Sequence, residues 1–214
     1  MKNEFLKRLV STILLIPMIL FIIIKGSFLF NFFILICFFI TSYEWHMMSK
    51  NKPHYLLGFI FLIFSYYTVY KLIDYGGDYI YFLLILLTCV STDIGGYVFG
   101  KIFKGPRITK ISPQKTYSGM IGSFFLTIIL TNIFFQLSYL LPKKIEFTFD
   151  TFIFVLLISA ISQLGDIIIS YFKRLSKIKN TGKILPGHGG ILDRIDGMIF
   201  AFPFSYIILL TNIF

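Results

Sequence analysis

Long apolar runs separated by short polar segments dominate the pattern along this chain. Apolar runs of roughly 20 residues cross a bilayer as helices. The pattern predicts an all-α, polytopic transmembrane helical bundle of about seven spans, with residues 1–214 forming a single integral membrane domain. The second run is short, and we expect it to be tilted or only partly inserted. The predicted spans are Leu9–Ile24, Phe28–Ser42, Leu56–Ile73, Tyr79–Phe99, Met120–Leu140, Phe152–Ile169 and Met198–Phe214.

Composition excludes a water-soluble domain. Of the 214 residues, 57% are hydrophobic and only 14% are charged, and a soluble fold of this length needs far more polar surface. The two cysteines, Cys37 and Cys89, lie inside predicted spans without a CxxC partner. We interpret both as small apolar residues with no disulfide or metal role.

The basic residues give the predicted spans an orientation. With the N-terminus inside and seven spans, 16 of the 20 Lys and Arg residues lie in inside segments. This bias favours a cytoplasmic N-terminus and an outside C-terminus. The segment Met1–Ile24 has the basic start of a signal peptide, but no small-x-small cleavage site follows it, so we expect it to stay as the first helix.

The net charge of +10 is compatible with anionic lipids or phosphate substrates as partners. The basic residues lie between membrane-spanning runs, so we expect no nucleic acid partner. Without an organelle-targeting segment, a bacterial-type inner membrane is the expected location. The sequence leaves a homodimer open.

Asp166 lies near the inner end of the sixth apolar run, where an unpaired carboxylate is costly. If the helix continues, Ser170, Lys173 and Arg174 follow four, seven and eight residues later on the same face. An ion pair within this helix would explain Asp166 structurally. A metal or a water-facing position would explain it functionally.

Asp193 and Asp196 are three residues apart at the predicted start of the last span. On a continuous helix both carboxylates would point the same way. Two carboxylates one turn apart suit a hard divalent cation, Mg²⁺ above all. Acidic residues that complement a helix dipole are the structural alternative.

A glycine-rich turn precedes this pair and carries a histidine. It contains Gly187, His188, Gly189 and Gly190. Glycines before a helix allow the backbone to present N–H groups to an anion. A plain loop with a histidine is the alternative.

A second polar region combines a carboxylate with a basic loop. Asp93 lies in the inner half of the fourth run, and Ser112 and Lys115 follow in the loop after it. A solvated basic loop would explain this segment without function. Carboxylates, an anion-binding turn and Lys or Arg on one membrane face are the components of phosphoryl or nucleotidyl transfer. We therefore place the catalytic region at residues 91–197.

The stretch from Ser170 to Asp196 closely resembles the signature of the phosphatidate cytidylyltransferases, or CDP-diacylglycerol synthases. The matching residues are Ser170 to Arg174, Lys179-Asn180 and Leu185 to Asp196. Shorter similarities occur at Tyr43 to Trp45, at Asp93 to Tyr97 and at Ile111 to Thr116. The chain has Asn180, Gln114 and Ser118 where the family usually has Asp, Lys and Glu.

The resemblance implies that CTP and phosphatidate in the bilayer react to give CDP-diacylglycerol and pyrophosphate at a cytoplasmic site. It implies that Asp166, Asp193 and Asp196 hold Mg²⁺, with a second cation left open. Lys173, Arg174 and Arg194 would neutralise phosphate. The remaining expected substrate-binding residues are Asp93, Ser112, Lys115, Gly187, His188, Gly189 and Gly190.

Two other functions remain as alternatives. An ion or anion transporter would use the intramembrane aspartates as a pathway. The outer halves of the predicted spans are nearly all Phe, Ile and Leu, which argues against a polar pathway. A CDP-alcohol phosphotransferase would need a D-G-x2-A-R…G-x3-D-x3-D run, which the sequence lacks.

Overall fold

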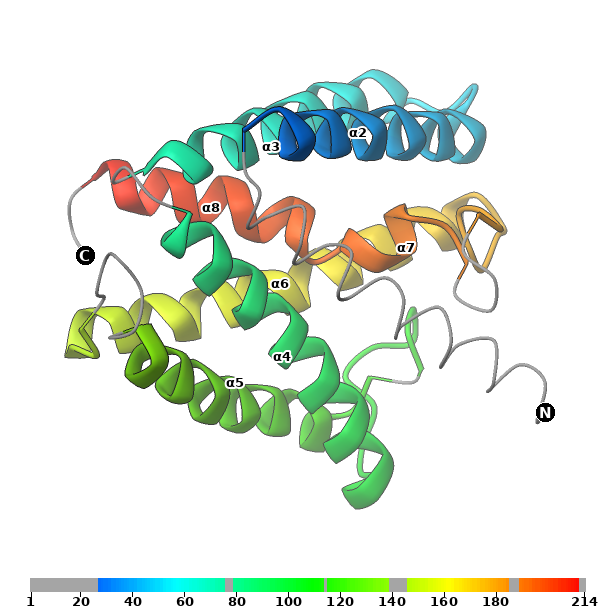
Figure 1. Cartoon of the computed structure of the whole chain (residues 1–214). Helices are drawn as coiled ribbons and strands as arrows, with labels where there is room; N and C mark the ends of the chain where they lie inside the picture. Colours follow the sequence, from blue (N-terminus) through cyan, green and yellow to red (C-terminus); the bar gives the residue numbers. More distant parts are fainter. Residues whose placement is uncertain (1–26, 76–78, 114, 139–145, 185–188, 212–214) are drawn as a thin grey trace. The chain divides into compact units, whose positions relative to one another are not determined.

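Helices account for nearly all the regular structure of this chain. The computed structural model describes residues 27–75, 79–113, 115–138, 146–184 and 189–211 (Figure 1). Within these ranges the helices are α2 (Ser27–Ser49), α3 (Tyr55–Asp74), α4 (Ile80–Phe103), α5 (Tyr117–Ser138), α6 (Phe149–Leu175), α7 (Leu192–Ile195) and α8 (Met198–Leu210).

Five of the described helices, α2 to α6, are long and apolar enough to cross a membrane. They confirm the predicted all-α, polytopic class. The predicted first span, Leu9–Ile24, lies outside the described residues, so the total of seven spans stays a prediction.

The predicted second and last spans differ in length from the helices observed there, and α6 is longer than the predicted sixth span. The second was expected to be short, but α2 has 23 residues and continues to Ser49. The residues that follow the apolar run continue the same helix, and one face of this part is buried. On that face, Glu44, Trp45 and Met48 are 2%, 3% and 5% exposed. The last described helix, α8, has 13 residues. That corresponds to a rise of roughly 20 Å, less than the ~30 Å of a hydrocarbon core.

The chain divides into two compact units, and the single membrane domain expected from the sequence stays a prediction. The first unit consists of Met1–Tyr66 and Phe172–Ile195, and the second of Tyr67–Tyr171 and Asp196–Phe214. Helices α3 and α6 continue from one unit into the other.

In the first unit, α2 and the first half of α3 form an antiparallel hairpin. Near the turn, the Trp45 indole N–H donates to the Tyr55 carbonyl at 3.0 Å. Further along, the Thr41 hydroxyl lies 3.2 Å from the Tyr66 hydroxyl. Earlier residues of α2 therefore contact later residues of α3, as expected for antiparallel helices.

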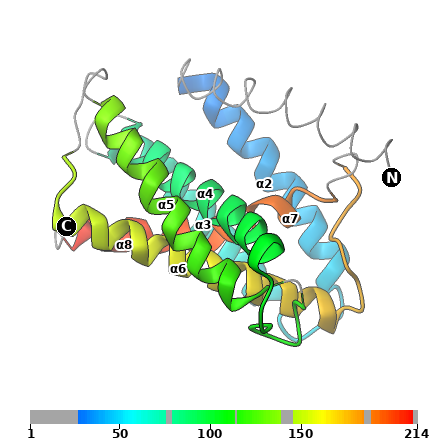
Figure 2. The same ribbon diagram turned by 90° about the horizontal axis from the view of Figure 1, so that it is seen from below.

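In the second unit, glycines bring α4 and α5 into close antiparallel contact, and the two helices run side by side (Figure 2). A Cβ atom placed on Gly95 would lie 2.8 Å from the Gly122 carbonyl oxygen and 2.8 Å from the Ser123 Cα. One turn later, a Cβ atom on Gly100 would meet the Gly119 Cα at 3.6 Å. Small residues at such contacts allow membrane helices to approach backbone to backbone.

A buried hydroxyl network joins three helices of the second unit. The Thr92 hydroxyl, on α4, lies 3.1 Å from that of Thr127 on α5 and 2.8 Å from that of Ser159 on α6. The Ser123 hydroxyl donates to the Thr92 carbonyl at 2.8 Å. Because a hydrocarbon environment offers polar groups no water partner, these hydroxyls hydrogen-bond to one another and to backbone.

Helix α8 packs against α6 through glycine contacts. A Cβ atom on Gly165 would lie 2.7 Å from the Phe200 ring, and one on Gly197 would lie 2.8 Å from the Ser162 carbonyl oxygen. Gly197 follows Asp196, and Ser162 lies one turn before Asp166 on α6. This packing therefore brings the backbone at Asp196 to the turn of α6 that precedes Asp166.

The close approach of α4 and α5 makes Gly95 a sensitive position. We expect Gly95→Ala to force the two backbones apart and to destabilise the protein by about 1–3 kcal/mol, the usual cost of overpacking. Gly96→Ala is the matched control, because its nearest neighbour is the Ser123 hydroxyl at 3.0 Å rather than backbone. Thermal unfolding in detergent measures both, and equal midpoints would contradict this packing.

Candidate active site

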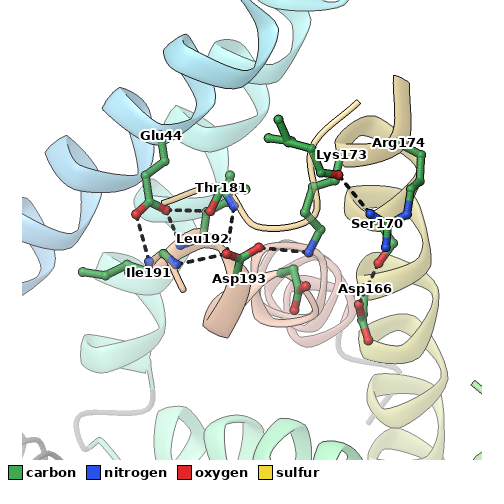
Figure 3. A network of polar contacts seen from close by, with 12 residues as sticks. Glu44, Asp166, Ser170, Lys173, Arg174, Thr181, Ile191, Leu192 and Asp193 are labelled. Atoms are coloured by element: carbon green, nitrogen blue, oxygen red, sulfur yellow. Dashed lines mark hydrogen bonds and ion pairs between the residues drawn. The ribbon is translucent and has the colours of Figure 1, made fainter. Parts of the chain in front are cut away.

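Asp193 is the centre of a polar cluster in the first unit (Figure 3). Its Oδ2 accepts hydrogen bonds from the backbone N–H groups of Thr181 at 2.8 Å and Gly190 at 3.0 Å. Its Oδ1 pairs with the Lys173 ammonium at 3.1 Å. The sequence predicted that both Asp193 and Lys173 belong to the site, and the structure pairs them directly.

The pair of Lys173 and Asp193 is largely removed from solvent. The side chains are 9% and 7% exposed, respectively. Burial of two charges is costly, and good geometry with further hydrogen bonds offsets that cost. Here the two backbone donors supply those hydrogen bonds to Asp193. Removal of one partner would leave the other charge buried and unpaired, which typically costs about 3–5 kcal/mol.

A second buried carboxylate, Glu44 of α2, holds the same turn from the other side (Figure 3). Its Oε1 accepts from the Ile191 N–H at 3.0 Å, and its Oε2 accepts from the Leu192 N–H at 2.8 Å. Oε2 also accepts from the Thr181 hydroxyl at 3.0 Å. Glu44 therefore caps the backbone donors that begin α7.

An aromatic cluster supports both carboxylates. The Phe172 ring lies 5.5 Å from that of Trp45 and 4.6 Å from that of His54, measured between centroids. Trp45 follows Glu44 in the chain, and Phe172 precedes Lys173, so the cluster fixes the last turn of α6 against α2. Burial lowers the pKa of His54, and the nearby positive charge of Lys52 lowers it further.

In the second unit, Asp166 pairs with Lys115. The Lys115 ammonium lies 2.5 Å from the Asp166 Oδ2 and donates to the Gln163 carbonyl at 3.3 Å. The Asp166 Oδ1 accepts from the Ser170 hydroxyl at 3.3 Å. The loop that carries Lys115 is closed by backbone hydrogen bonds, one of them from the Lys115 N–H to the Ser112 carbonyl at 3.0 Å.

This pairing gives Asp166 a partner that the sequence did not indicate, while its metal role stays a prediction. The expected continuation of α6 through Lys173 and Arg174 is confirmed. The lysine that pairs with Asp166 comes from the loop between α4 and α5 and not from α6 itself. That loop therefore takes part in the polar contacts of the second unit, and the predicted substrate contact of Lys115 stays a prediction.

Asp196 and Asp193 do not share a continuous helix. Helix α7 ends at Ile195 and α8 begins at Met198, so the turn between them separates the two aspartates. The prediction that both point the same way on one helix does not apply. Asp196 is 7% exposed, and its Oδ1 accepts from the Gly197 N–H at 3.1 Å.

The described part of the glycine-rich turn binds protein carboxylate. Gly189 has φ +90°, a conformation that favours glycine. The Gly190 N–H donates to Asp193, rather than remaining open to a phosphate. Gly187 and His188 lie outside the described residues, so their predicted contact with phosphate stays a prediction.

Three other predicted site residues are exposed, whereas Ser112 is half-buried. Arg174 is exposed and its guanidinium donates to the Ile178 carbonyl at 2.9 Å. Arg194 on α7 and Asp93 on α4 are exposed as well.

The predicted metal ligands can be compared with the residues that the structure describes. Within those residues, no group of three or more His, Cys, Asp or Glu side chains is close enough to hold a metal ion. Mg²⁺ in enzymes commonly uses only one or two carboxylates together with substrate phosphates and water. The metal role of the aspartates therefore stays a prediction.

The model of the cytidylyltransferase family matches residues 54–212, which include α3 to α8 and both polar clusters apart from Glu44. The chain belongs to the cytidylyltransferase family. This membership gives no support to the transporter alternative.

Several similar members of the family are bacterial proteins named phosphatidate cytidylyltransferase. The chain is 30% identical to that of Rickettsia typhi over 206 residues, which cover 94% of this chain and 90% of the relative. It is 34% identical to that of Rickettsia bellii, with 97% and 91% covered. The match to that of Bacillus subtilis is 38% identical and covers 71% of this chain and 55% of the relative.

Glu44 lies in a family-like patch of the sequence, but the sequence pattern gave it no role. The signal was present, since a carboxylate between apolar residues requires partners. Those partners lie 137 to 148 residues away in the sequence, so the helical pattern of α2 could not indicate them.

The aromatic support of the site can be tested at Gly58. A Cβ atom there would overlap the Trp45 ring, so we expect Gly58→Ala to displace the indole and to cost about 1–3 kcal/mol of stability. The chain has a single tryptophan, so intrinsic fluorescence reports on Trp45 alone. We expect emission at longer wavelength in Gly58→Ala and unchanged emission in Leu57→Ala, whose side chain is 67% exposed. Unchanged emission in both would contradict the packing.

Proposed function

We propose that this chain is a membrane-bound cytidylyltransferase that converts CTP and phosphatidate to CDP-diacylglycerol and pyrophosphate. The observation that carries the proposal is the buried pair of Lys173 and Asp193 within the family-matched segment. The relatives named phosphatidate cytidylyltransferase support the choice of lipid substrate.

The reaction needs orientation and charge neutralisation more than a protein nucleophile. A phosphate oxygen of phosphatidate attacks the α-phosphorus of CTP, a new P–O bond forms, and the bond to the β-phosphate breaks to release pyrophosphate. The attacking oxygen is already anionic, so no general base has to generate it. The barrier comes from bringing two polyanions together in line, which positioned cations lower.

Two lysines held by aspartates, Lys115 and Lys173, are suited to neutralising phosphate charge. The Lys115 ammonium uses two donors for Asp166 and Gln163, and an ammonium group has three. Its third donor would bind a phosphate oxygen of CTP or of the lipid. Lys173, held by Asp193 on the last turn of α6, would stabilise charge that develops on the phosphates. The exposed guanidinium groups of Arg174 and Arg194 would neutralise the remaining charge.

The donor set fits Mg²⁺, which prefers carboxylate oxygens. We propose that Asp166, Asp193 and Asp196 supply its carboxylate ligands, one or two to each ion, with substrate phosphates and water as the remaining ligands. The Asp166 side chain is 28% exposed, and a carboxylate has about four lone-pair sites, so three hydrogen bonds to Asp193 still leave one. Bound Mg²⁺ would neutralise the triphosphate and stabilise the leaving pyrophosphate.

We also propose that the site faces the cytoplasm. The support is the basic bias of the predicted inside segments, which hold 16 of the 20 Lys and Arg residues. A site on this face would meet soluble CTP while phosphatidate stays in the bilayer. The long apolar helices α2 to α6 are consistent with this membrane location.

A reconstitution assay tests the function. Purified protein in phosphatidate vesicles with Mg²⁺ should transfer label from α-labelled CTP to lipid, whereas γ-labelled CTP should give labelled pyrophosphate. Chelation of Mg²⁺ should stop the transfer. Asp193→Ala should lower the rate by on the order of 10²–10³-fold.

The matched control is Asp150→Ala, which removes an exposed carboxylate from the first turn of α6 and should leave the rate unchanged. Absence of labelled lipid with folded wild-type protein would refute the proposed function. Full activity of Asp193→Ala would refute the role of Asp193.

A further inference from the structure

The turn before α7 has its backbone donors divided between two carboxylates. The Gly190 N–H donates to Asp193, whereas the Ile191 and Leu192 N–H groups donate to Glu44. Three successive donors are therefore satisfied by acidic side chains. The position of each carboxylate depends on the other, because both bind the same short piece of backbone.

Thr181 links the two carboxylates a second time. Its backbone N–H donates to the Asp193 Oδ2 at 2.8 Å, and its hydroxyl donates to the Glu44 Oε2 at 3.0 Å. Two backbone segments, at residues 181–182 and 190–192, thus meet around the same pair of acids. Movement of Glu44 would release both segments from their common anchor.

Backbone approaches the Glu44 carboxylate closely from two segments. A Cβ atom on Gly182 would lie 2.5 Å from the Glu44 Oε1, and one on Gly190 would overlap its Oε2. Glu44 itself is 2% exposed. Its three hydrogen bonds, from Thr181, Ile191 and Leu192, all come from neutral donors, so its contacts match those of an anion bound by backbone amides.

We propose that Glu44 is a positioning residue for the transfer reaction: it holds the 190–192 turn and Thr181 so that the Asp193 carboxylate keeps its place beside Lys173. This inference rests on the proposed function, because it assigns Glu44 an effect on the catalytic step. Glu44 acts through Asp193 and requires no contact of its own with substrate.

Glu44→Gln tests the proposal with minimal change in volume. Both carboxylate oxygens of Glu44 accept hydrogen bonds, and a glutamine would present an NH₂ group, a donor, to one of these donors. We expect one backbone N–H to lose its partner and the turn to loosen. The predicted effect is a decrease in kcat of about 10–100-fold, as for loss of a supporting hydrogen bond to a catalytic ligand, with a smaller change in KM for CTP.

Hydrogen exchange gives a readout that is independent of activity. In Glu44→Gln, the peptide covering residues 189–195 should exchange faster than in wild type. Thr181→Val removes only the hydroxyl contact and should reproduce the effect in weaker form. Since both changes act on one contact, the double variant should be less impaired than the product of the two single effects.

Thr41→Val is the matched control. Thr41 is fully buried on the same helix, and its hydroxyl contacts Tyr66 rather than the turn. We expect it to lower thermal stability while kcat per folded molecule and exchange of residues 189–195 stay unchanged. A decrease in kcat in this control equal to that in Glu44→Gln would overturn the positioning role.

The remaining outcomes separate this proposal from the proposed function. If the wild-type protein is active and Glu44→Gln changes neither kcat nor hydrogen exchange, the role of Glu44 is overturned while the proposed function stands. Inactive wild-type protein with faster exchange in Glu44→Gln would refute the function while supporting the contact. If Glu44→Gln does not fold, Thr181→Val decides: unchanged kcat and exchange there would overturn the proposal.

Discussion

Backbone N–H groups at the start of a helix need acceptors, and the first unit depends on how this chain supplies them before α7. Here the acceptors are two carboxylates: Asp193, which belongs to α7 itself, and Glu44, which comes from α2. Because an unmade hydrogen bond in a buried site costs about 1–3 kcal/mol, this arrangement fixes the turn firmly. It also leaves a catalytic candidate, Asp193, held from two directions.

In the second unit the constraint is helix packing, because the hydrophobic effect does not drive helices together within a membrane. Helices α4 and α5 meet through glycines, and buried hydroxyls such as Thr92 join them to α6. This framework holds both ends of the loop that carries Lys115, whose ammonium reaches Asp166. The polar pair is thus positioned by close backbone packing and not by the loop alone.

The sequence predicted the helices well because apolar runs of spanning length are compatible with few structures besides a membrane helix. It also identified Asp166, Lys115, Lys173 and Asp193 as members of polar clusters. It could not assign the pairs, since the lysine beside Asp166 is 51 residues away in the sequence and not on the same helix. The end of α7 at Ile195 was also missed. So were the contacts of Glu44, because they join residues far apart in the sequence, which helical periodicity does not encode.

The central claim is that Lys173 and Asp193 act as one unit in nucleotidyl transfer. A double-mutant cycle tests it most directly, with kcat measured for Lys173→Ala, Asp193→Ala and the double variant in phosphatidate vesicles. When two residues act as one unit, either single substitution removes their joint contribution to kcat, and the second substitution removes nothing more. We therefore predict that the double variant is no slower than the slower single variant. If the decrease in kcat of the double variant equals the product of the two single decreases, the claim is contradicted.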